Sequence, residues 1–146
     1  MRRMMLGLAA VAAVLTTSAL LVPEGEVVTL HTRDAAGGEF ETQLWIARVA
    51  GDDYLRASSP DNHWLERLRA SPRVELSRSR HALPEAERER FEAVVADAPD
   101  VRAAVNEAFA RKYGLADRLW SLVADRSSAV AVRLVPAEGA AGEDAP

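Results

Sequence analysis

Arginine, serine, asparagine, histidine and tryptophan follow one another closely in residues 56–67, between a β-like run and an amphipathic helix. A guanidinium group can bind a phosphate through two hydrogen bonds. Serine hydroxyls and the N–H groups at a helix start add donors, and an indole can cover a flat ring. The stretch is therefore the candidate small-molecule site, with these members: Arg56, Ser58, Ser59, Asn62, His63, Trp64 and Arg67.

Two readings of this stretch stay open. Arg56 precedes Ser58 by two residues, so on a strand their side chains share one face, and a phosphate could meet both. In the other reading Arg56 is a solvated residue on the rim and Trp64 belongs to the core. Tyr113 and Trp120 are assigned to helix packing rather than to a ligand.

Other chemistries find little support. The chain has no cysteine, which excludes disulfides, thiolate catalysis and cysteine zinc sites. Its three histidines match no metal-binding spacing, and no serine stands in a G-x-S-x-G frame. We therefore expect no metal. The net charge is −4, but without its two ends the chain carries only about −2, and such a nearly neutral domain argues against nucleic acid as the main partner.

The site must be positioned by β-strands and short helices. Alternating apolar residues, turn residues and caps predict strands at 26–32, 39–49, 54–58, 74–77 and 129–136, and helices at 63–70, 97–113 and 116–124. The acids Asp97 and Asp100 predict a capped start for the second helix. The run from Phe91 to Ala96 is ambiguous, because its propensity favours a helix.

The first 25 residues have a different composition. Arg2 and Arg3 precede an uncharged run from Met4 to Val22, close to the ~17–25 residues that span a bilayer. We expect a signal peptide or membrane anchor in residues 1–25, one domain in 26–136 and a disordered acidic tail in 137–146. If the run inserts, the domain lies outside the cytoplasm. If it is not an export signal, the protein is cytoplasmic.

Several sequence runs resemble one known group of proteins. They are D-D-Y-L-R-A-S from Asp52, W-L-E-R-L-R-A-S-P-R-V-E-L from Trp64, V-N-E-A-F-A-R-K-Y-G-L-A-D-R-L from Val105 and A-V-A-V-R-L-V-P from Ala129. This order resembles the flavin- and deazaflavin-binding split β-barrel superfamily, which includes pyridoxamine-phosphate-oxidase-like proteins and deazaflavin-dependent nitroreductases. The resemblance covers about residues 27–136 and is closest to small members of unassigned function.

The resemblance implies an α+β fold, a six-stranded antiparallel split β-barrel with flanking helices, here preceded by one hydrophobic N-terminal helix. It makes the run from Phe91 to Ala96 a strand. It implies FMN or deazaflavin as cofactor, hydride transfer to a small organic acceptor, and a homodimer.

In the family, the corner that Arg56, Ser58 and Trp64 would occupy binds the phosphate side of the cofactor. Lysines that many members carry there are missing, and Asn62 and His63 take their place. The alternative is a non-catalytic, membrane-tethered split-barrel module that binds a small molecule or a partner.

Overall fold

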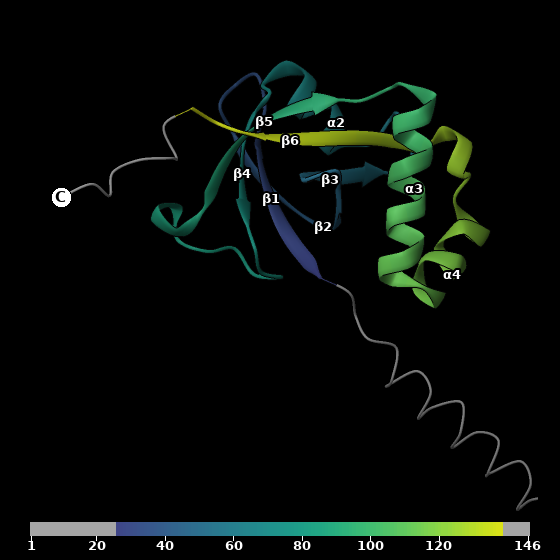
Figure 1. The fold of residues 1–146 in the computed structure, drawn as a ribbon. Coiled ribbons are helices and arrows are strands. Elements are labelled where there is room, and N and C mark those ends of the chain that lie inside the picture. The colour runs from purple at the N-terminus through teal and green to yellow at the C-terminus, as the bar shows by residue number, and fades with distance from the viewer. Residues whose placement is uncertain (1–25, 139–146) are drawn as a thin grey trace, which may run out of the picture.

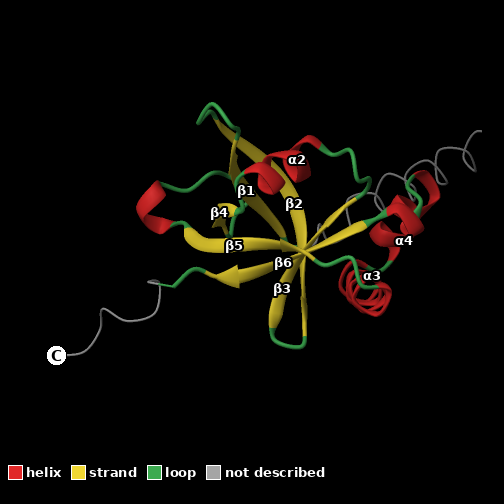
Figure 2. Ribbon diagram, turned by 90° about the horizontal axis from the view of Figure 1, so that it is seen from above, coloured by secondary structure: helices red, strands yellow, loops and turns green. Residues whose placement is uncertain are grey.

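The computed structural model describes residues 26–138, which form one closed barrel of six antiparallel strands with helices packed around it (Figures 1 and 2). Around the barrel the strand order is β1-β2-β3-β6-β5-β4. The strands are β1 (Val27–Arg33), β2 (Glu39–Val49), β3 (Asp52–Ala57), β4 (Arg73–Ser77), β5 (Glu89–Val95) and β6 (Val130–Pro136). The helices are α2 (His63–Ala70), α3 (Pro99–Tyr113) and α4 (Leu115–Val123), with 3₁₀ turns at Glu85–Glu87 and Arg126–Ser128.

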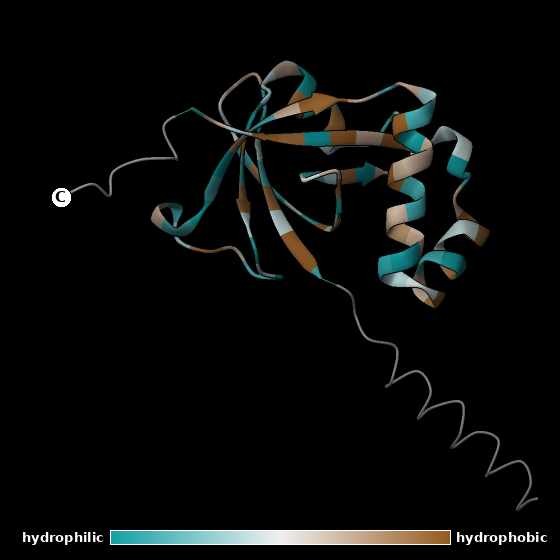
Figure 3. Ribbon diagram, viewed as in Figure 1, coloured by the Kyte–Doolittle hydropathy of each residue, from teal (hydrophilic) through white to brown (hydrophobic). Residues whose placement is uncertain are grey.

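The barrel interior is the main core. Alternate residues of each strand point inward, so Val28 and Leu30 of β1 and Leu55 and Ala57 of β3 are fully buried. Figure 3 shows β6 as mostly hydrophobic, with a hydrophilic segment in its middle. Helix α2 adds Trp64, Leu65 and Leu68 to this core.

A second, smaller core lies outside the barrel, where α3 covers β2, β3 and β6. It joins Tyr54 and Ala131 of the sheet to Val105, Phe109 and Tyr113 of α3. Gly114, with a φ of 51°, ends α3 and lets α4 begin at once in a new direction. The outer face of β2 meets α3, and Arg56 on the outer face of β3 contacts both helices; this is where the candidate site forms.

The predicted α+β fold with a six-stranded antiparallel barrel is confirmed. The strand reading of residues 91–96 is confirmed as β5, because pairing with both β4 and β6 outweighs the local helix propensity. The predicted cap at Asp97 is wrong: α3 starts at Pro99, with Ala98 at the N-cap and no side-chain cap bond. The proline fixes a helical φ at the first position, which favours this later start.

The expected hydrophobic N-terminal helix and most of the expected acidic tail lie outside the described residues. Among the helices between Glu26 and Glu138, none is both long and apolar enough to span a bilayer.

Candidate functional site

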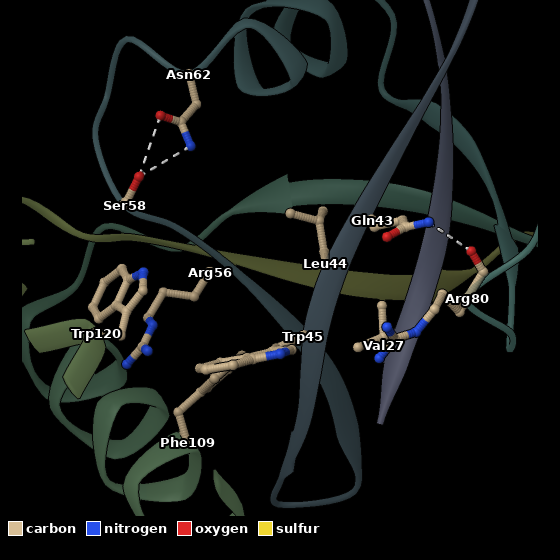
Figure 4. Close-up of a pocket in the computed structure, with 10 residues that line it drawn as sticks. All are labelled: Val27, Gln43, Leu44, Trp45, Arg56, Ser58, Asn62, Arg80, Phe109 and Trp120. Atoms are coloured by element: carbon tan, nitrogen blue, oxygen red, sulfur yellow. Dashed lines mark hydrogen bonds between the residues drawn. The ribbon is translucent and has the colours of Figure 1, made fainter. Parts of the chain in front are cut away.

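A cavity of about 330 Å³ opens between β2, β3, the loop that leads to α2, and helices α3 and α4 (Figure 4). Its volume is at the lower end of the range of small-molecule sites. Aromatic, cationic and amide side chains share its wall. The lining residues are Val27, Gln43, Leu44, Trp45, Arg56, Ser58, Asn62, Arg80, Phe109 and Trp120.

Arg56 occupies the inner wall of this cavity. Leu55 and Ala57 point into the barrel, so Arg56 points outward, beneath α3 and α4. Its guanidinium lies over the ring of Phe109 at 4.4 Å and over that of Trp120 at 4.1 Å. Cation–π contacts of this kind are strengthened where water is excluded, and here they hold both rings in place.

The charge of Arg56 is already neutralised within the protein. Nη2 donates to Oδ1 of Asp117, and Nη1 donates to Oδ1 of Asn106 at 3.1 Å. Asp117 is fully buried and also accepts a hydrogen bond at 2.5 Å from Arg126. Burial lowers the pKa of the Arg56 guanidinium, and Asp117 partly offsets that effect. The expectation of a solvated rim arginine is therefore wrong, because a partner 61 residues later takes it into the interior.

Trp45 and Tyr113 form a second aromatic layer. Their rings stack with centroids 4.5 Å apart and planes 9° apart. The Tyr113 hydroxyl accepts from the Ile46 N–H at 3.0 Å and lies 2.7 Å from the Ile46 carbonyl oxygen. Burial raises the pKa of Tyr113 to about 12, although the bond to Ile46 acts in the opposite direction. Tyr113 thus fixes Trp45 against the cavity.

Polar groups edge the cavity. The side chains of Ser58 and Asn62 are hydrogen-bonded to each other at 3.4 Å, from Asn62 Nδ2 to Ser58 Oγ. On another side, Gln43 Nε2 donates to the carbonyl oxygen of Arg80 at 2.9 Å. Figure 4 shows these two pairs at separate edges of the cavity. Amide and hydroxyl groups are therefore within reach of a ligand in the cavity.

The structure brings together three of the seven residues predicted for the site: Arg56, Ser58 and Asn62. Trp64 is 4% exposed and lies in the barrel core, as one of the two readings expected. Sequence reasoning did not place Trp45 and Phe109 at the cavity. It assigned Trp120 to helix packing, although this ring lines the cavity.

The other three predicted residues have their own local partners. The Ser59 hydroxyl accepts from the Asp61 N–H at 3.2 Å within the turn. His63 is exposed and lies 3.4 Å from a Glu66 carboxylate oxygen. Arg67 donates to Thr32 Oγ1 at 2.8 Å, and its guanidinium covers the ring of Phe40 at 4.4 Å. None of the three lines the cavity.

The residues that line the cavity fit the ring of a flavin better than its phosphate. The aromatic wall and the amide edges suit a flat ring that carries hydrogen-bonding groups. The phosphate anchor expected of Arg56 does not fit, since this guanidinium is bonded to Asp117 and Asn106. A bidentate clamp needs donors that point at the ligand.

Comparison with known proteins finds similarity in structure rather than in sequence. No protein-family profile and no curated protein matches the chain. HutZ, the heme storage protein from Vibrio cholerae, superposes with a TM-score of 0.53 at 18% identity, over 80% of this chain and 84% of the other. An F420 reductase superposes with a TM-score of 0.51 at 16% identity, over 80% and 90%. A candidate pyridoxamine 5′-phosphate oxidase from Listeria innocua gives 0.52 at 12% identity, over 84% and 93%.

The chain therefore has the split β-barrel fold of the pyridoxamine-phosphate-oxidase-like group, as its sequence resemblance indicated. The names of these three proteins differ in function: a heme storage protein, an F420 reductase and a candidate pyridoxamine 5′-phosphate oxidase. At such low sequence identity the similarity establishes the fold only, so the ligand has to be inferred from the residues that line the cavity.

Proposed function

We propose that the chain binds the ring of a flavin or a deazaflavin in the aromatic cavity and acts as an oxidoreductase on a small organic acceptor. The observation that carries this proposal is the wall formed by Trp45, Phe109 and Trp120 beside amide and hydroxyl groups, in a cavity of about 330 Å³. When bound, such a ring supplies hydride-transfer chemistry. The similar folds of an F420 reductase and a candidate pyridoxamine 5′-phosphate oxidase support this choice.

The protein's own residues then bind and orient the ring. Phe109 and Trp120 are held in position by the Arg56 guanidinium, and Trp45 is held by Tyr113. These fixed apolar faces exclude water from one side of a bound ring. Arg56 is a positioning residue in this proposal.

Heme fits the cavity less well than a flavin, although one similar fold is a heme storage protein. Iron in heme is usually held by an axial histidine, cysteine, methionine or tyrosine. The ten cavity-lining residues include none of these. Tyr113 lies behind Trp45, and its hydroxyl is already bonded to the backbone of Ile46. A flavin or deazaflavin ring needs no such ligand.

The first test is an absorption spectrum of the full chain purified from its native host. An oxidised flavin gives two bands in the near-ultraviolet and blue, whereas a deazaflavin gives one. Trp120→Ala should then weaken cofactor affinity about tenfold, which is ~1.4 kcal/mol and within the range of a lost ring contact. Leu122→Ala, on the exposed side of the same helix, is the matched control and should bind as the wild type. If the wild type binds neither FMN nor a deazaflavin, the proposal fails.

Helix α4 favours a second candidate, a non-catalytic module tethered to a membrane. Its buried side carries Asp117, while four of its apolar residues face outward. Those with exposed side chains are Leu115, Leu119, Leu122 and Val123, with Leu122 at 81% and Val123 at 86%. Their spacing places them on one side of the helix. Patches of this kind mark interaction surfaces.

The position of Glu26, four residues after the uncharged run from Met4 to Val22, makes a bilayer the proposed partner of the exposed apolar side of α4. Glu26 pairs with Lys112 at 2.6 Å, only three residues before α4 starts at Leu115. An anchor formed by the uncharged run from Met4 to Val22 would therefore bring α4 close to the membrane. In this candidate the full chain fractionates with membranes and carries no flavin absorption.

A further inference from the structure

Three side chains that can bind metal ions meet on the outer surface of the β1–β2 hairpin. His31 of β1 is the direct cross-strand partner of Glu41 of β2. Glu39 lies two residues before Glu41, so both carboxylates share one face of the strand. One donor atom of each residue lies within 4.8 Å of the other two.

His31 contributes a buried nitrogen atom without a hydrogen-bond partner. Only 3% of the residue is exposed, and its Nδ1 makes no hydrogen bond among the described residues. This atom lies 3.6 Å from Glu39 Oε1 and 3.8 Å from Glu41 Oε1. Buried polar atoms are nearly always hydrogen-bonded. A buried nitrogen without a hydrogen bond that faces two carboxylate oxygens is therefore a candidate metal ligand.

We propose that His31, Glu39 and Glu41 bind a divalent metal ion of the zinc class. One imidazole nitrogen and two carboxylate oxygens are a donor set that zinc accepts at about 2.0–2.2 Å. Two such ligands around a tetrahedral ion lie about 3.4 Å apart, which follows from those bond lengths. The distances from Nδ1 to the two carboxylates need to shorten only slightly to reach this geometry. Three protein ligands leave the fourth position to water.

The surroundings of the three ligands support the proposal. The other ring nitrogen of His31, Nε2, is 2.9 Å from Ser77 Oγ, and Ser77 Oγ accepts from the Leu83 N–H at 3.0 Å. In the tautomer in which Nε2 donates to Ser77, Nδ1 has a free lone pair that can bind a metal ion. Glu39 accepts from Arg88 at 3.0 Å and from Arg33 at 3.5 Å. Outer hydrogen bonds of this kind orient carboxylates that bind metals.

This site is separate from the aromatic cavity. His31 and Glu39 border another cavity, of about 770 Å³, which shares no lining residue with the first. The inference therefore does not depend on the proposed oxidoreductase function. Sequence motifs did not reveal the site, because its ligands become neighbours only when β1 pairs with β2.

The experiment uses the full chain without an affinity tag. Co²⁺ is titrated into the metal-free protein and followed by its visible absorption, and Zn²⁺ is then added to displace it. Because the chain has no cysteine, thiolates cannot compete for the ion. Glu41→Gln is the decisive variant, since Glu41 is half exposed and outside the core. His63→Gln is the matched control, because His63 also lies beside a carboxylate but is exposed.

The expected result is one bound ion per chain in the wild type, with affinity at least 100-fold lower in Glu41→Gln and in His31→Gln. Affinity should be unchanged in His63→Gln. Zn²⁺ should raise the melting temperature of the wild type and of His63→Gln, but not that of Glu41→Gln or His31→Gln. If His31→Gln fails to fold, Glu41→Gln alone decides. The proposal is overturned if the wild type binds no ion at a single site, or if Glu41→Gln binds as tightly as the wild type.

Discussion

Replacing Asp117 by asparagine should destabilise the protein strongly. Asp117 is fully buried, and its two carboxylate oxygens accept from Arg56 and Arg126. Asparagine keeps the shape but removes the charge and turns one acceptor into a donor that faces a guanidinium. The side chain of Arg56, 3% exposed, would then be a buried cation without its anion.

The expected loss is about 3–5 kcal/mol, the usual cost of removing one partner of a buried ion pair. Domains of this kind are stable by only about 5–15 kcal/mol, so the loss is a large fraction of the total. Replacing both partners with apolar residues, Arg56→Met with Asp117→Leu, should cost much less than the two single changes together, because only Arg126, whose side chain is 37% exposed, then loses its anion.

Urea unfolding followed by tryptophan fluorescence measures this loss, with Trp120 directly against Arg56 as an internal probe. The control is Glu107→Gln, which removes an exposed ion pair with Arg111 and should cost less than about 0.5 kcal/mol. If Asp117→Asn costs less than about 1 kcal/mol, the ion pair does not hold α4 to the barrel, and our account of the cavity wall is refuted.

Three further predictions follow from individual contacts. One of the two tyrosines should ionise near pH 12 in an absorbance titration, and Tyr113→Phe should remove that step. The stability linked to the raised pKa of Tyr113 is present below about pH 10 and is lost as the pH rises through 12. Burial raises the pKa of Asp53, but hydrogen bonds from Arg48 and Arg78 outweigh it and lower the pKa overall. Asp53→Asn should therefore cost about 1–2 kcal/mol in urea unfolding at neutral pH, and the difference should vanish as pH falls below about 3.9 toward the lower folded pKa. A fluorophore on Leu122→Cys in the full chain should be quenched by lipid-borne quenchers in vesicles and one on Ala36→Cys should not; equal signals would contradict membrane contact of α4.

Local patterns were sufficient to predict most of the barrel. Alternation around Val28 and Leu30, with turn residues after each run, predicted strands within about two residues of those observed. The apolar spacing of Trp64, Leu65 and Leu68 gave α2 its observed bounds, and the same spacing explains why Trp64 is in the core. Residues 91–96 needed the family resemblance, since their strand state depends on two distant partners.

The cavity could not be predicted from local patterns, because its wall is assembled from the strands β1, β2 and β3, the helices α3 and α4, and two loops. The residues around Arg56 on β3 give no sign that Asp117 of α4 will pair with it. The predicted stretch of residues 56–67 contains the loop that borders the cavity, yet the aromatic wall comes from β2, α3 and α4. The ion pair between Arg56 and Asp117 makes this arginine part of the protein interior rather than a direct contact for a ligand phosphate.

That pairing also decides which variant can test the proposed cofactor. Truncating Arg56 would leave the fully buried Asp117 with one cation instead of two and would release Phe109 and Trp120 together. Any loss of affinity would then be mixed with a loss of stability. Trp120 is partly exposed and makes its contact with Arg56 through the ring face alone. Trp120→Ala removes part of the wall and leaves the ion pair in place, so its effect on affinity reports on the cavity itself.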